Sequence, residues 1–127
     1  MLKMVPKEFV EKLTEFARGD NRIVAAFVFG SMATDRARVR SDMDVAIMTR
    51  GSVEGIQKIR WETALSTLLG EDVDVVIFSE ATPLLQHQIL KDGFLVYDGD
   101  LGERVRQEVV SRHRYLDTQF LYRLLDG

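Results

Sequence analysis

Two aspartates stand one residue apart at the entrance to an apolar run, and this pair is the strongest chemical signal in the chain. Asp42 and Asp44 belong to the segment "SDMDVAIM", which ends at Met48. Side chains alternate between the two faces of a strand, so both carboxylates are expected to point the same way, with Cα atoms roughly 6–7 Å apart. Burying two like charges is costly without a counter-charge, and carboxylate oxygens are ligands that suit Mg²⁺. The pair therefore indicates either a magnesium site or a turn with two hydrated aspartates.

The turn before these aspartates has residue types that bind phosphate. Gly30 and Ser31 end the apolar run "RIVAAFVF", and Asp42 follows Ser31 after ten intervening residues. A glycine lets a phosphate approach the main chain, while a serine hydroxyl and exposed amides donate hydrogen bonds to it. A Gly-Ser pair alone is also typical of an ordinary strand-ending turn. Its spacing from an aspartate pair on one face is what favours a nucleotide site.

The segment between the turn and the aspartates carries three alternating arginines, Arg36, Arg38 and Arg40. A guanidinium matches two phosphate oxygens at once, so at least one of them is able to meet a triphosphate. A solvated loop or a patch that faces a partner is the alternative. Arg40 and Ser41 are our candidates for further nucleotide contacts, although Ser41 also fits a cap of the turn into the next strand.

A second pair of aspartates offers a third metal ligand. Asp72 and Asp74 lie two residues apart in "EDVDVVIF", at the start of another apolar run. Asp74 is the preferred candidate because apolar residues follow it directly, as they follow Asp44. Asp72 fits the entry of the strand.

Hydrophobic periodicity and Gly or Pro punctuation predict the elements that must position these residues. The predicted helices cover 6–18, about 56–68, 82–91 and about 101–125, and the predicted strands cover 22–29, 44–48, 73–78 and 94–98. This order favours an α/β (or α+β) fold, a small mixed sheet of about four strands flanked by helices. The link between the first two strands, about 14 residues long, has no helical period, and a loop of that length is usually functional.

Composition excludes several classes of protein. The 127 residues, 46% of them hydrophobic and 29% charged, suit a single globular domain spanning 1–127. The absence of cysteine excludes disulfides and thiolate metal sites. No signal peptide or membrane-spanning run is evident, so a cytoplasmic protein is expected. A net charge of −3 argues against binding of long nucleic acid.

The predicted C-terminal helix has more apolar side chains than one buried stripe uses. They are Tyr115, Leu116, Phe120, Leu121, Tyr122, Leu124 and Leu125. Packing on the sheet would cover about half of this surface. The remainder is expected to be a contact in a homo-oligomer or a docking surface for a partner, unless packing against the core uses all of it.

Three other side chains favour structural interpretations. His87 and His113 lie among polar or charged neighbours and are expected to be solvated. Trp61 is expected in the packing of its helix, with stacking on an adenine as the alternative.

The segment "GSMATDRARVRSDMDVAIM" (30–48), with "VDVVIF" at 73–78, resembles the DNA polymerase beta-like nucleotidyltransferase superfamily. The small size is similar to the minimal nucleotidyltransferase (MNT) group. The segment "RVRQEVVSRHRYLDTQFLYRLL" (104–125) resembles the closing helix of MntA-type antitoxins, which are paired with HEPN-domain toxins. One departure from the pattern is Asp35, where many relatives have glycine.

The resemblance implies transfer of AMP from ATP to a hydroxyl, with release of pyrophosphate. Asp42, Asp44 and Asp74 would hold two Mg²⁺ ions, and positioning and charge stabilisation would do most of the catalysis. Asp74 is also a candidate general base. The leading hypothesis is an antitoxin that places AMP on a tyrosine of a HEPN toxin.

Three alternatives stay open at this point. Transfer to a small molecule, as in aminoglycoside nucleotidyltransferases, would need an acceptor pocket that this chain could build by self-association. A degenerate module that binds a toxin without catalysis would have no reason to keep all three acids near a core. A phospho-acceptor receiver domain places its acids at the carboxyl ends of strands, whereas Asp42 and Asp44 open one.

Overall fold

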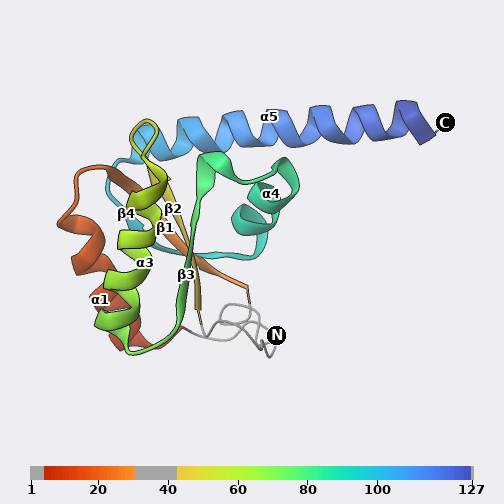
Figure 1. Ribbon diagram of the computed structural model, residues 1–127. Helices are drawn as coiled ribbons and strands as arrows, with labels where there is room; N and C mark the ends of the chain where they lie inside the picture. The colour runs from red at the N-terminus through yellow and green to blue at the C-terminus, as the bar shows by residue number, and fades with distance from the viewer. Residues whose placement is uncertain (1–4, 31–42, 127) are drawn as a thin grey trace.

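The computed structural model describes residues 5–30 and 43–126, which form one mixed sheet with helices on both faces (Figure 1). The fold class expected from the sequence is confirmed. In chain order the elements are α1 (Lys7–Arg18), β1 (Ile23–Phe29), β2 (Met43–Thr49), α3 (Gly55–Leu69), β3 (Val73–Ile77), the short 3-10 helix η1 (Phe78–Glu80), α4 (Pro83–Asp92), β4 (Phe94–Asp98) and α5 (Leu101–Asp126). The predicted loop between the first two strands lies mostly outside the described residues.

The strands are ordered β3-β2-β1-β4. β1 pairs antiparallel with both β2 and β4, whereas β2 and β3 are parallel. The strand predicted for 73–78 ends one residue early, because Phe78 begins η1. Its ring packs against Phe27, with the ring centroids 6.4 Å apart. β1 and β2 are therefore the central strands, and β3 and β4 form the two edges.

Each face of the sheet has its own apolar cluster. On one face, Leu13 of α1 and Trp61 and Leu65 of α3 pack against alternate residues of the strands. On the other face, Phe78 of η1 and Ile89 of α4 pack against the strand residues whose side chains point to that face. Because both faces are covered, β1 and β2 read as continuous apolar runs. Thr82 is the N-cap of α4, and its side chain accepts a hydrogen bond (3.2 Å) from the main-chain N–H of Leu85.

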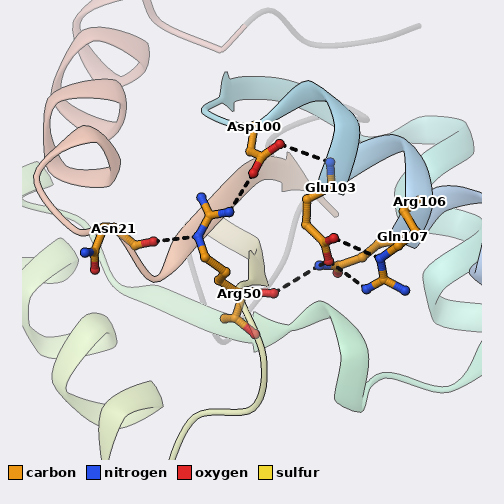
Figure 2. Close-up of polar contacts among 7 residues, drawn as sticks. Asn21, Arg50, Asp100, Glu103, Arg106 and Gln107 are labelled. Carbon is orange, nitrogen blue, oxygen red and sulfur yellow. Dashed lines mark hydrogen bonds and ion pairs between the residues drawn. The ribbon is translucent and has the colours of Figure 1, made fainter.

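Polar contacts attach the start of α5 to the end of the central strands (Figure 2). Arg50, which follows β2, donates to Asp100 over 2.6 Å and to the main-chain carbonyl of Asn21 over 3.1 Å. Gln107 donates to the main-chain carbonyl of Thr49 over 3.0 Å. The first turns of α5 are therefore held against the sheet, and its C-terminal half extends past the rest of the molecule (Figure 1).

Within the ranges 5–30 and 43–126, no helix combines the length and the apolar character needed to cross a membrane.

Candidate active site

Asp44 is the second residue of β2 and lies on the face of the sheet that α4 covers. Its neighbours Met43 and Val45 belong to the cluster on the opposite face. In the antiparallel pairing of β1 and β2, Asp44 lies opposite Phe29, the last residue of β1. Only 5% of Asp44 is exposed. Burial of this kind is costly for a carboxylate unless it is paired or binds a cation.

Gly30 bends the chain directly against the Asp44 carboxylate. Its φ of +76° lies in the left-handed region that disfavours side chains. A Cβ added to Gly30 would also collide with Oδ2 of Asp44. The glycine predicted as a phosphate-approach position is therefore needed for the backbone turn and for the carboxylate beside it.

Asp74 lies directly beside Asp44. The two residues are register partners in the parallel pairing of β2 and β3, so their side chains leave the same face of the sheet. Asp74 is exposed, whereas Asp44 is buried. A buried and an exposed carboxylate thus stand side by side, next to the Gly30 bend.

Two side chains of α3 hold the edge strand that carries Asp74. Ser66 Oγ accepts a hydrogen bond from the Val73 main-chain N–H over 3.0 Å, and Glu62 Oε2 accepts one from that of Val75 over 2.9 Å. The main chain on both sides of Asp74 is therefore fixed. The sequence analysis missed this role, although Glu62 and Ser66 stand four residues apart and so share one face of a helix.

The structure separates the two candidates for the third acid. Asp72 precedes β3, and its main-chain carbonyl accepts a hydrogen bond (3.2 Å) from the N–H of Met43. Asp74 is inside β3, opposite Asp44. This register favours Asp74, the preferred candidate of the sequence analysis.

The donor set fits a magnesium ion, because both acids offer carboxylate oxygens from adjacent strands. Across the described ranges, no three or more His, Cys, Asp or Glu side chains gather to hold a metal. The third predicted ligand, Asp42, lies outside those ranges. The same is true of the other predicted loop contacts, Ser31, Arg40 and Ser41, and of Asp35.

Two aromatic predictions have different outcomes. Trp61 packs in the core on the face opposite Asp44, and its Nε1–H donates to Asp20 over 3.2 Å. The expected packing role is confirmed. His87 was expected to be solvated, which is wrong: its ring is partly buried and stacks on Tyr115 with centroids 3.8 Å apart.

The comparison with protein families decides the class of this site. The family model "Polymerase beta, Nucleotidyltransferase" matches residues 11–101, a span that includes Gly30, Asp44 and Asp74. The chain belongs to the polymerase beta nucleotidyltransferase family. The superfamily proposed from the sequence is thereby confirmed, and the protein is an enzyme of the nucleotidyltransferase class.

This nucleotidyltransferase also resembles individual proteins. It is 30% identical over 67 residues to MJ0435 of Methanocaldococcus jannaschii, named as a candidate protein adenylyltransferase, and the match covers 53% of this chain and 72% of that protein. A chain from a toxin–antitoxin crystal structure with AMP-PNP has a TM-score of 0.77 at 20% identity, over 91% of this chain and 94% of that one.

A second solved structure contains a tri-AMPylated Shewanella oneidensis HEPN toxin in complex with an MNT antitoxin. One of its chains has a TM-score of 0.75 at 20% identity to this nucleotidyltransferase, over 94% of this chain and 93% of that one. At such low identity these two likenesses establish the shared fold.

Proposed function

We propose that this nucleotidyltransferase moves AMP from ATP to a tyrosine hydroxyl of a HEPN-family toxin and so acts as the antitoxin of that pair. Three relatives support this proposal. MJ0435 is named as a candidate protein adenylyltransferase. The two similar solved chains come from a toxin–antitoxin complex with AMP-PNP and from a complex with a tri-AMPylated HEPN toxin.

The observation that carries the proposal is the register pairing of Asp44 with Asp74 beside the Gly30 bend. These two carboxylates, with Asp42 as a further ligand, would hold Mg²⁺. Bound Mg²⁺ would neutralise charge on the triphosphate and lower the pKa of the attacking hydroxyl. Asp74, the exposed member, would also accept the proton of that hydroxyl.

The remaining roles concern the nucleotide. Because Gly30 has no side chain, a triphosphate would be able to approach the main chain at this bend, beside the Asp44 carboxylate. Ser31, Ser41 and Arg40 are proposed as phosphate contacts because a hydroxyl or a guanidinium donates hydrogen bonds to phosphate oxygens.

The decisive experiment uses the purified protein, Mg²⁺, ATP labelled at the α-phosphate and the protein that co-purifies with this chain. We expect label on a tyrosine of that protein and release of pyrophosphate. Asp44→Asn and Asp74→Asn should each slow labelling by about 100-fold or more, because charge stabilisation by a metal is worth several kcal/mol.

Asp72→Asn is the matched control, since it removes an exposed acid two residues from Asp74. Labelling by this variant should stay close to that of the wild type. Circular dichroism and thermal unfolding should show that all three variants are folded. Labelling at the wild-type rate by Asp44→Asn would eliminate the metal-site proposal.

A further inference from the structure

The outer side of α5 carries a long apolar stripe. Its members recur at steps of four or seven residues and fall within an arc of about 100°, spanning about 29 Å along the helix. Each is between 42% and 62% exposed, and they are Val105, Val109, Leu116, Phe120 and Leu124. Leu121, Tyr122 and Leu125 are also exposed, on other sides of the last turns. A stripe of this length is much larger than a scattered surface hydrophobe.

The opposite side of α5 makes the contacts with the rest of the molecule. Gln107 binds the main chain of Thr49, and Tyr115 stacks on His87 of α4. Ser111 is the last buried residue of the helix among the residues described. The stripe therefore faces away from the sheet, and the last turns lack tertiary packing. An isolated helix of that length is marginal in water, so a covering partner would stabilise it.

A groove between α4 and α5 meets the stripe at Leu116, which belongs to both. It encloses about 310 Å³, and Leu90 of α4 and Leu116 of α5 supply apolar lining. Lys91 and Arg112 add two cations, and no described residue lining the groove is acidic. Arg112 makes one long contact, 3.4 Å, with Glu108. The groove therefore favours an apolar ligand with acidic groups at its border.

The groove is on the same side of the sheet as the candidate active site. α4 covers that side through Ile89, which packs against Ala46 and Met48 of β2. These two residues alternate along β2 with Asp44 and so share its face. Gly93, which follows α4, lies against Phe29, the register partner of Asp44. A protein bound along α4 would thus lie on the side of the sheet that carries the carboxylates, whereas α5 contacts the opposite end of β2, at Thr49.

From these observations we propose that the stripe and the groove together bind an amphipathic helix, bordered by acidic residues, of the protein that receives AMP. A straight apolar stripe suits a helix, and ridges of one helix pack into the grooves of another. Lys91 and Arg112 line the groove and complement acidic groups. A second copy would bring the same cations to the contact. This inference rests on the proposed function, because it assigns a docking surface to the proposed protein substrate.

The test measures, by calorimetry, binding of the acceptor protein from the labelling experiment, the protein that co-purifies with this chain. Phe120→Glu should weaken the affinity by about tenfold or more, the size expected for a central apolar contact. Ile59→Glu is the matched control, because Ile59 is 54% exposed on α3 and Phe120 is 59% exposed. Its affinity should equal that of the wild type. Equal affinities of Phe120→Glu and the wild type, or no binding by the wild type, would overturn the inference.

A charge reversal tests the acidic border. Arg112→Glu should weaken binding by about fivefold and reduce its salt dependence, since a cation that faces acids contributes to steering and affinity. Arg60→Glu, an exposed reversal on α3, is the control. Unchanged binding by Arg112→Glu would contradict an acidic partner.

Two further measurements separate the possible failures. Asp44→Asn should bind with wild-type affinity while losing transfer, and Phe120→Glu should raise the KM for the acceptor protein without changing kcat. Binding without any labelling by the wild type would defeat the proposed function and leave docking standing. Sedimentation of the wild type as a dimer that Phe120→Glu dissociates would assign the stripe to a second copy and overturn the inference.

Discussion

At the scale of single residues, the candidate site depends on the absence of a side chain at Gly30. The bend at this glycine and the buried Asp44 carboxylate occupy adjacent space, and any Cβ at position 30 would displace the carboxylate. The glycine thus serves a spatial need in addition to its backbone conformation. The left-handed backbone conformation alone would explain a glycine at position 30. It would not explain why the Asp44 carboxylate needs the space beside that glycine.

Alanine substitutions can separate these two needs. Gly30 and Gly51 have similar φ values, +76° and +79°, but only Gly30 has an atom within 4 Å of an added Cβ. Gly30→Ala and Gly51→Ala should each lower the free energy of unfolding by about 1 to 2 kcal/mol, the cost of a left-handed L residue. Gly30→Ala alone should slow AMP transfer, by about tenfold or more, because it moves a metal ligand.

Urea unfolding gives the stabilities, and the labelling assay gives the transfer rates. Equal activities of the two variants would show that Asp44 does not depend on the space beside Gly30.

At the scale of elements, β3 carries a proposed catalytic residue although it is an edge strand. Edge strands expose unpaired main-chain groups and are less constrained than central ones. Here Ser66 and Glu62 of α3 bind the outward N–H groups on both sides of Asp74. The helix therefore performs the constraining role that a further strand would have in a wider sheet.

Glu62 offers a test of this constraint. Glu62→Ala removes the acceptor for the Val75 N–H, so amide exchange at Val75 should accelerate and AMP transfer should fall by about tenfold. Glu62→Gln keeps an acceptor oxygen and should restore both properties. Lys58→Ala is the matched control, because it removes only the 3.2 Å ion pair of Glu62. Identical amide exchange in Glu62→Ala and Lys58→Ala would refute the assignment.

At the scale of the whole molecule, a polar network orders the first turns of α5, the part of the helix that contacts the sheet through Gln107. Figure 2 shows Glu103 between Arg106 and Gln107, with its main-chain N–H bound to Asp100. Hydrogen bonds from Arg106, and then from Gln107, lower the pKa of Glu103 to about 2. The folded state thus favours the ionised Glu103 carboxylate. The hydrogen bonds that this carboxylate accepts link the first turns of α5 to one another.

The lowered pKa predicts how stability depends on pH. A depressed carboxylate pKa stabilises the fold above the unfolded pKa of 4.5, and this contribution is lost as pH falls toward 2. Glu103→Gln should therefore lower the free energy of unfolding at pH 7 by up to about 1 kcal/mol, as is usual for partly exposed ion pairs. The difference from the wild type should vanish near the lower pH.

Chemical unfolding at a series of pH values measures this difference. Glu11→Gln, at an exposed position of α1, controls for the general loss of a negative charge. If the difference in free energy of unfolding between the wild type and Glu103→Gln grew as the pH fell from 4.5, its sign would be opposite to the expected one. That result would contradict the stabilising role of the Glu103 carboxylate.

Much of the fold was predictable because its signals are local. Continuous apolar runs predicted the central strands, and Gly70 and Pro83 marked a helix end and a helix start that the structure confirms. Predicted ends differ from the observed ones by about a residue, as terminal turns usually do. The proximity of Gly30 to Asp44 was also foreseeable, since the pairing of the two adjoining strands brings them together.

Sequence alone determined the residue types, the elements and the family, because each depends on periodicity or on spacing along a short stretch. Only the tertiary structure decided that β2 and β3 pair in parallel, which places Asp74 rather than Asp72 opposite Asp44. It also decided that Glu62 holds β3. These outcomes depend on contacts between residues distant in the chain, where a shift of one residue in strand register would move every side chain to the other face.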